Sequence, residues 1–177
     1  MTTIAFTGMP VSGKTEAVKC AEKKGIRIVR MGEIIWDEVK KQGLAINDET
    51  VACIATKMRE IQGKDFWAQQ TLKKIQDDSL IIDGVRSYEE VMTFKKNLGN
   101  FILVAIHASP QIRYQRILGR RRRDDAMNLT QIKKRDAREL TWGIGSVISM
   151  ADKMFINEGS LEDLYMFVEN LLDQNKI

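Results

Sequence analysis

Histidine, cysteine and proline are scarce in this chain of 177 residues, which contains one histidine, two cysteines and two prolines. Cys20 and Cys53 lie far apart in the sequence, and His107 is near neither of them. A zinc site draws its ligands mainly from cysteine and histidine, so it is hard to assemble here. We expect two free thiols, which suit the reducing interior of a cell.

Long apolar runs are missing as well. No stretch approaches the ~20 apolar residues that a membrane-spanning helix needs, and no basic region precedes a long apolar stretch at the start, as in a signal peptide. The formal net charge is only +4, and much of the excess lies in "GRRRRDD" at 119–125. Such a cluster favours a local anionic partner over a wholly basic surface. These absences predict a cytoplasmic protein without a membrane partner.

Short apolar runs alternate with helical periodicity along the chain. Runs typical of strands lie at 2–6, 26–30, 79–83, 101–108 and 152–157. Strands that alternate with helices predict βαβ units and a parallel sheet covered on both faces. The sequence therefore predicts the α/β class: a three-layer α/β/α sandwich around a five-stranded parallel sheet.

Two helical excursions interrupt this alternation. The first, at about 33–76, shows helical periodicity and no convincing strand, and the second is the arginine-rich region 119–142. No linker rich in proline, glycine or serine bounds either excursion. We therefore predict a single domain over 1–177, with a helical insertion at about 33–76 and a short arginine-rich segment at about 119–128.

The segment "GMPVSGKT" at 8–15 matches the phosphate-loop pattern G-x-x-x-x-G-K-[ST] in full, after a strand and before a helix. In such a loop, backbone amides surround phosphate oxygens and the helix N-terminus adds partial positive charge. We expect Lys14 to reach the β- and γ-phosphates of ATP and Thr15 to bind Mg²⁺. The predicted nucleotide-binding residues of the loop are Gly8, Pro10, Val11, Ser12, Gly13, Lys14, Thr15 and Glu16.

Among phosphate-loop enzymes, a small-molecule kinase fits the length and the motifs. A GTPase would need the guanine-reading N-K-x-D, whereas the only Asn-Lys pair here is Asn175-Lys176, at the end of the chain. In "LIIDGVRS", Asp83 is placed to support Mg²⁺. Arg86 follows the turn and is suited to clamp an anionic substrate.

Arginines recur at helical spacing in "RYQRILGRRRRDD". Arg113, Arg116 and Arg120 are three and four residues apart and share one helix face. Arginines placed there would stabilise the charge of a phosphoryl group in transfer. A solvated charge run paired with Asp124 and Asp125 is the plain alternative. A nucleic-acid partner ranks third, because no aromatic residues are interleaved and the net charge is modest.

With these motifs in view, the chain resembles a nucleoside monophosphate kinase of the adenylate kinase type over almost its whole length. "MGEII" at 31–35 is similar to the Thr-Gly-Asp segment of that family, and "DGVR" at 83–86 to its Asp-Gly-Phe-Pro-Arg turn. "RILGRR" at 116–121 is similar to the arginine pair that flanks its lid. The nearest resemblance is to archaeal proteins called adenylate-kinase-related or dephospho-CoA-kinase-like. It implies ATP and Mg²⁺ as cofactors, with Arg116 and Arg120 near the transferred phosphate. It also implies that the insertion at about 33–76 binds the acceptor and that the arginine-rich segment at about 119–128 is a short lid.

The chain also departs from the adenylate kinase pattern. Trp36 stands where those kinases place an arginine for the acceptor phosphate. Arg59, on a helix expected at 48–62, either replaces that charge or is an exposed helix residue. Arg135 or Arg138 would correspond to the far side of the lid. We expect the aromatic residues Phe66, Trp67 and Trp142 to pack rather than to stack on a ligand.

The C-terminal stretch 151–172 is similar to the ending of dephospho-CoA kinases. That resemblance implies that Asn157 and Gly159 shape a loop against the adenine of ATP. A plain strand-to-helix turn, with Ser160 as the helix N-cap, explains the same residues equally well.

Glu33 separates the possible reactions. A phosphate acceptor arrives already ionised and needs no general base, whereas a hydroxyl acceptor benefits from a nearby carboxylate. Glu33 in the first turn of a helix also simply complements the helix dipole. The sequence leaves these roles open.

The leading hypothesis is an ATP- and Mg²⁺-dependent kinase of a small nucleotide-like acceptor, with a nucleoside monophosphate such as AMP as the first candidate. Its predicted catalytic residues are Lys14, Arg86, Arg116, Arg120 and Glu33. The runner-up is dephospho-CoA kinase-like transfer to a hydroxyl, with Glu33 as the base. From another class comes a nucleotide-regulated binding protein that could associate with RNA through its arginine run.

Overall fold

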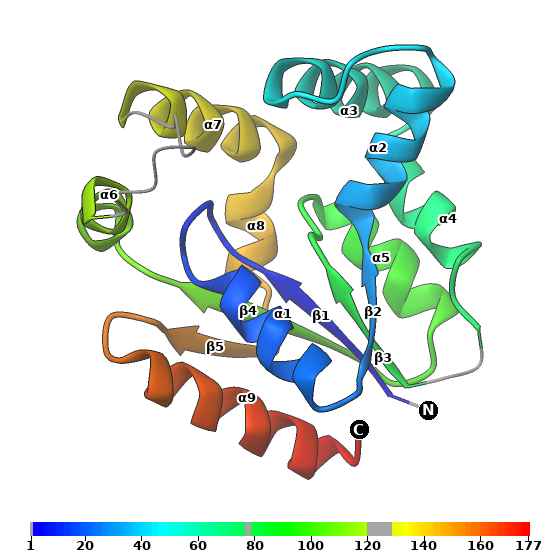
Figure 1. The fold of residues 1–177 in the computed structure, drawn as a ribbon. Helices are drawn as coiled ribbons and strands as arrows, with labels where there is room; N and C mark the ends of the chain where they lie inside the picture. Colours follow the sequence, from blue (N-terminus) through cyan, green and yellow to red (C-terminus); the bar gives the residue numbers. More distant parts are fainter. Residues whose placement is uncertain (1, 77–78, 120–128) are drawn as a thin grey trace.

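A five-stranded sheet forms the centre of the computed structural model, which describes residues 2–76, 79–119 and 129–177 (Figure 1). All neighbouring strands are parallel, in the order β2-β3-β1-β4-β5. The strands are β1 (Thr3–Thr7), β2 (Arg27–Arg30), β3 (Leu80–Asp83), β4 (Phe101–His107) and β5 (Lys153–Ile156). The predicted sheet is confirmed, with strand ends that differ by one residue from the predicted ones.

Helices cover both faces of this sheet, so the three-layer sandwich is confirmed as well (Figure 1). Alternate residues of β1 point to opposite faces: Ile4 and Phe6 join one core, and Ala5 joins the other. The first core is closed by α1 (Lys14–Lys23) and α9 (Leu161–Asn175). The second is closed by α5 (Tyr88–Asn97) and α8 (Ile144–Ser149) together with the helices between β2 and β3.

The excursion between β2 and β3 contains α2 (Met31–Lys41), α3 (Asp48–Gln62) and α4 (Phe66–Leu72). It is helical as predicted, although it begins at Met31, directly after β2. Trp67 is buried and donates its ring N–H to the carbonyl of Ala55 at 3.1 Å, as expected of a packing residue.

On the other side of the molecule, α6 (Pro110–Gly119) and α7 (Leu129–Trp142) flank the predicted lid. Apart from Gly119, that lid lies outside the described residues. The six-residue helix α8 was not predicted, because two glycines interrupt its apolar pattern at Gly143 and Gly145. Among the described residues, no helix combines the length and apolar character needed to cross a membrane.

The loops that follow β1 and β3 are tied together at one edge of the sheet. Phe6 and Asp83 lie opposite each other in the parallel register. Beyond them, Gly84 N–H donates to the Phe6 carbonyl at 3.2 Å, and the Thr7 hydroxyl donates to the Val85 carbonyl at 2.9 Å. Ligands of parallel sheets bind outside this carboxyl edge, so the fold brings the phosphate loop and "DGVR" together where a site is expected.

A buried carboxylate holds the β3–α5 loop against α3. Glu90 has no exposed surface and accepts hydrogen bonds from the Arg59 guanidinium at 2.8 Å and the Arg86 backbone N–H at 2.7 Å. It also accepts from the Ser87 N–H in a helix-capping box. Arg59 is therefore a buried structural residue. Of the two roles that the sequence left open for Arg59, the exposed helix residue is excluded, because Glu90 compensates its charge in the interior.

We expect Glu90→Gln to destabilise the fold by about 3–5 kcal/mol, because it leaves the buried Arg59 without its counter-charge. Urea denaturation followed by circular dichroism measures the loss. The matched control is the neighbouring Glu89→Gln, whose partly exposed side chain pairs with Lys64 at 3.4 Å. It should change the unfolding free energy by less than ~1 kcal/mol. Equal losses in the two variants would contradict the assigned role of Glu90.

Candidate functional site

The phosphate loop depends on two glycines that no other residue could replace without a clash. A Cβ on Gly8 (φ 150°) would lie 2.3 Å from the carbonyl oxygen of Ile106, and one on Gly13 (φ 105°) would lie 2.0 Å from the side-chain nitrogen of Asn157. Val11 also adopts a left-handed backbone, with φ 64°. A β-branched residue in this conformation costs about 1–2 kcal/mol. Backbone strain of this kind concentrates at binding sites.

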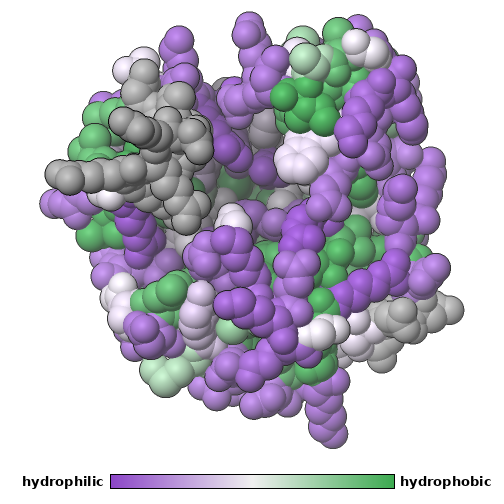
Figure 2. All heavy atoms as spheres, viewed as in Figure 1, coloured by the Kyte–Doolittle hydropathy of each residue, from purple (hydrophilic) through white to green (hydrophobic). Residues whose placement is uncertain are grey.

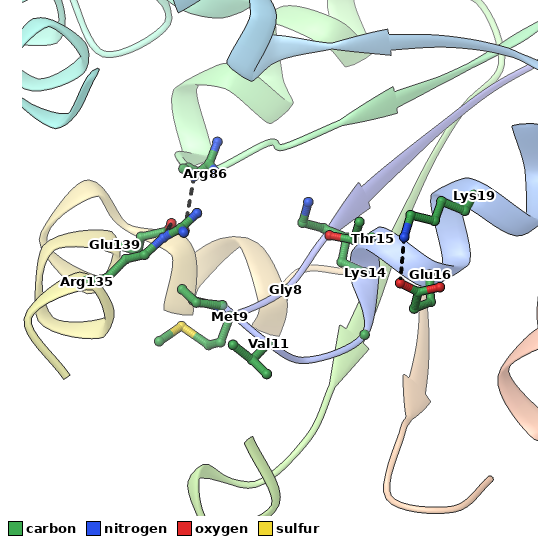
Figure 3. A pocket seen from close by; sticks show the side chains of 12 residues that line it. Gly8, Met9, Val11, Lys14, Thr15, Glu16, Lys19, Arg86, Arg135 and Glu139 are labelled. Atoms are coloured by element: carbon green, nitrogen blue, oxygen red, sulfur yellow. Dashed lines mark hydrogen bonds and ion pairs between the residues drawn. The ribbon is translucent and has the colours of Figure 1, made fainter. Parts of the chain in front are cut away.

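A cavity of about 340 Å³ opens above this loop (Figure 3). The loop residues predicted to bind nucleotide line it, with the exception of Ser12. Ser12 is buried, and its hydroxyl has no hydrogen-bond partner among the described residues. A loop that tolerates no Cβ at Gly8 or Gly13 and lines a cavity before a helix fits a phosphate chain, which binds backbone amides at a helix N-terminus.

Lys14 and Asp83 form an ion pair at the edge of this cavity. Asp83 ends β3, and Lys14 begins α1, so the pair joins the helix that follows the loop to the strand beside β1. Thr15 lines the cavity beside Lys14. A carboxylate and a hydroxyl are oxygen ligands of the kind that Mg²⁺ takes together with nucleotide phosphates. Thr15 and Asp83 thus fit the ion, whose binding at this site remains a prediction.

A second cavity, of about 160 Å³, lies beside the first, among α2, α3 and α7. The space-filling view is hollowed on this side of the molecule, with a largely hydrophilic rim (Figure 2). Trp36 and Trp142 line the cavity together with apolar residues of α2 and α3, and its charged residues are Asp48, Arg86, Arg135, Arg138 and Glu139. Trp142, expected only to pack, thus belongs to a cavity wall.

The two cavities meet at three shared residues, Arg86, Arg135 and Glu139. Glu139 is 3% exposed and accepts hydrogen bonds from the Nε of Arg86 at 3.0 Å and the Nε of Arg135 at 3.2 Å. Burial by itself would raise the pKa of Glu139, but the charges of the two arginines outweigh it and lower that pKa. In the same way, burial opposes the charge of Arg86, yet the Glu139 carboxylate keeps the pKa of Arg86 raised.

Two contacts join α7 to α3 at the second cavity. Arg138 pairs with Asp48 at 3.0 Å, and the ring N–H of Trp142 donates to the Thr56 hydroxyl at 3.0 Å. The Arg59 guanidinium also lies over the Trp142 ring, 4.8 Å from its centroid. These contacts make α7 a wall that the first and second cavities share.

Behind the phosphate loop, two arginines of α6 support its backbone. Arg113 is buried, forms a two-pronged ion pair with Asp136 at 2.7 and 2.9 Å, and donates to the Pro10 carbonyl at 2.9 Å. Arg116 donates to the carbonyls of Ser12 at 3.3 Å and Asn157 at 2.6 Å. The structure therefore gives both side chains contacts that hold the loop in place.

A third cavity, of about 310 Å³, lies on the outer side of the loop and is lined by Val11, Gly13, Glu16, Arg116 and Asn157, among others. The buried amide of Asn157 donates to the Ser12 carbonyl at 2.8 Å, so it supports the loop directly. This position, adjacent to the phosphate cavity, is compatible with the predicted adenine contact, which remains a prediction.

For two predicted catalytic residues, Arg120 and Glu33, the described cavities give no support. Arg120 lies outside the described residues, as do Arg122 and Arg123. Glu33 lines neither the first nor the second cavity; its side chain is 55% exposed and lies 3.9 Å from the guanidinium of Arg30. Sequence reasoning missed Glu139, because a glutamate four residues after Arg135 reads as an ordinary helix ion pair.

We expect Gly13→Ala to weaken ADP binding at least tenfold, because the new Cβ would push Asn157 away from the loop and force a backbone that alanine rarely adopts. Calorimetric titration with Mg·ADP measures the effect. Gly25→Ala is a suitable control, because Gly25 also has a positive φ of 82° but no atom within 4 Å of an added Cβ. Nucleotide affinity within twofold of wild type in Gly13→Ala would contradict this geometry.

Comparisons with known proteins place this site in context. A family model described as an AAA domain matches residues 7–133. A UPF0200 protein of Methanococcus maripaludis is 43% identical over 96% of this chain and 95% of its own length. A UPF0200 protein of Thermoplasma acidophilum is 41% identical over 97% of this chain and 95% of its own length.

Similar solved structures include shikimate kinases. Those of Aquifex aeolicus and of Acinetobacter baumannii, the latter in complex with shikimate, have TM-scores of 0.53 and 0.58 at 19% and 17% identity. They cover 99% and 100% of this chain, and it covers 98% and 96% of theirs. At such low identity the likeness shows the fold alone. The chain matches an AAA-domain model and has the fold of a phosphate-loop kinase. Because its archaeal relatives are similar over almost their whole length, the chain belongs to the UPF0200 family.

Proposed function

We propose that this protein is an ATP- and Mg²⁺-dependent phosphotransferase of the cytoplasm that acts on a small nucleotide-like acceptor, with a nucleoside monophosphate such as AMP as the first candidate. The observation that carries this proposal is the junction of two cavities. The phosphate-loop cavity meets a tryptophan-lined cavity at Arg86, Arg135 and Glu139. A kinase needs such a junction, because its donor and acceptor must meet in line at one phosphoryl group.

On the donor side, the loop from Gly8 to Thr15 would hold the triphosphate, and Lys14 would exchange Asp83 for phosphate oxygens. Asp83 and Thr15 would then hold Mg²⁺, which, when bound, neutralises the charge that develops in transfer. The adenine would lie toward Asn157 and the third cavity. Arg116 would act from behind the loop, through its contacts with Ser12 and Asn157.

On the acceptor side, the second cavity combines flat apolar walls with cationic groups. The indoles of Trp36 and Trp142 suit the planar base of a nucleotide. Arg86 and Arg135 present guanidinium groups at the junction, and guanidinium groups bind phosphate through paired hydrogen bonds. The insertion at 33–76 supplies α2 and α3 to this cavity, which supports its assignment as an acceptor-binding insertion. The proposed single domain over 1–177 includes this insertion and the proposed lid at 119–128.

Transfer to a hydroxyl, as in dephospho-CoA kinase or the shikimate kinases of similar fold, is the second candidate. It would need a carboxylate that can take the hydroxyl proton. Among the described residues of the second cavity, the carboxylates are Asp48 and Glu139, and both are paired with arginines. Glu33 would have to turn toward the acceptor from an exposed position. These constraints favour a phosphate acceptor.

A nucleotide-regulated binding protein with little turnover is the third candidate. Its RNA contact would rest on the run of four arginines at 120–123, all of which lie outside the described residues. The first and second cavities are small and share two arginine side chains, as suits a small anionic ligand. This favours a small-molecule kinase.

We expect acceptor-dependent ADP release from ATP, with AMP the strongest acceptor of the set AMP, CMP, UMP, GMP and dephospho-CoA. A coupled assay for ADP, corrected for release without acceptor, measures it. Lys14→Ala is the control, because it removes the cation that neutralises the β- and γ-phosphates. ADP release that none of these acceptors increases would contradict the kinase proposal, and a response to dephospho-CoA alone would select the second candidate.

We expect Glu33→Ala to leave kcat within about twofold of wild type, because a phosphate acceptor needs no general base. In contrast, Arg86→Ala should lower kcat by about 10²- to 10³-fold, because it removes a preorganised charge at the transfer point. Steady-state kinetics with AMP and ATP measure both variants. A collapse of kcat in Glu33→Ala with unchanged acceptor affinity would instead indicate a hydroxyl acceptor with Glu33 as its base.

A further inference from the structure

Glu139 places a buried negative charge at the point where two phosphate-bearing substrates would meet. It belongs to α7, its side chain is 3% exposed, and it lines both the first and the second cavity (Figure 3). Its lowered pKa means that the carboxylate is ionised at neutral pH. A phosphate group at the junction would be repelled by this carboxylate, so Glu139 weakens the binding of the anions that the site is proposed to hold.

The contacts of Glu139 fix the positions of two arginine side chains. It accepts from the Nε of Arg86 and from the Nε of Arg135, so it holds both guanidinium groups by the same edge. Arg86 is further fixed by a hydrogen bond from Nη1 to the Gly84 carbonyl at 2.9 Å. Among the described residues, these contacts leave the Nη2 groups of both arginines for a ligand. An arginine held by Nε keeps its outer N–H groups in a defined plane.

Arg86 and Arg135 come from different elements, and Arg86 has further contacts outside the junction. Arg86 follows β3, and Arg135 lies on α7, and both side chains donate to the same carboxylate of Glu139. The Arg86 guanidinium lies 6.0 Å from the centroid of the Trp142 ring, and its backbone N–H is bound by Glu90. Glu139 is thus the contact that brings a β3-loop arginine and a helix arginine to one place.

We propose that Glu139 is a positioning residue of the proposed kinase: it aligns Arg86 and Arg135 for the transferred phosphoryl group and, as their counter-charge, lowers the affinity of the empty junction for free phosphate. This inference rests on the proposed function. Glu139 weakens the binding of anions in the ground state and fixes the geometry of the two arginines. Fixed arginines raise the rate of phosphoryl transfer only if they act in the transition state. A site with two unpaired arginines would instead trap inorganic phosphate and hold its products.

The test is Glu139→Gln, which keeps the shape of the side chain and removes its charge. We expect inorganic phosphate to bind the variant about three- to tenfold more tightly, because one repulsive charge has gone. We expect kcat with AMP to fall about 10- to 100-fold, because the arginines lose their alignment. Phosphate binding is measured by thermal stabilisation with saturating Mg·ADP, so that the phosphate loop is filled. Ile132→Ala, a buried apolar change on the same helix, is the control for a loosened α7.

The opposite direction of the two effects distinguishes positioning from a merely structural role. Weaker phosphate binding together with a lower kcat, as expected for Ile132→Ala, would overturn the proposal. An unchanged kcat or an unchanged phosphate affinity in Glu139→Gln would overturn it too. If the wild type showed no acceptor-dependent turnover, the proposed function would fail. The phosphate titration would still decide whether Glu139 acts as the counter-charge of the arginine pair.

Discussion

Arginine–carboxylate pairs taken out of water hold together the carboxyl edge of this sheet. The pairs are Arg59–Glu90, Arg86–Glu139 and Arg113–Asp136. Removing one partner from a buried pair leaves an uncompensated charge, at a cost of about 3–5 kcal/mol. Each buried pair therefore requires that the two elements that carry its residues pack against each other. The helices that frame the cavities are positioned by charge as well as by apolar packing.

Helix α7 shows the consequence most clearly. Asp136 connects it, through Arg113, to the Pro10 carbonyl of the phosphate loop. Glu139 connects it to the loop after β3, and Trp142 connects it to α3. One helix is thus connected to the phosphate loop, the junction and the second cavity. A ligand that shifted α7 would act on all three.

The comparisons and the cavities answer different questions. The shikimate kinases share the fold at low identity, and a fold of this kind supports transfer to many acceptors. What singles out an acceptor is the local chemistry of the second cavity: two indoles, three arginines, and carboxylates that are already paired. These side chains belong to α2, α3, α7 and the β3–α5 loop, outside the phosphate loop itself.

The sequence by itself determined the parts whose residues are contiguous. The phosphate loop is one run of eight residues, so its motif predicts its geometry, and the period of the apolar residues predicts the parallel sheet with its two helical layers. The six residues of α8 escaped prediction, because two glycines hide a short pattern.

The second cavity and its junction with the first depended on residues that only the tertiary structure brings together. Arg86 and Glu139 are 53 positions apart, and Arg59 and Glu90 are 31 apart. In the sequence, Arg59 reads as a surface charge and Glu139 as an ordinary helix residue. Chain folding buries them, and burial converts a common charged side chain into one that must have a specific partner. That conversion has no local signal, so the structure alone decided which charges form the junction.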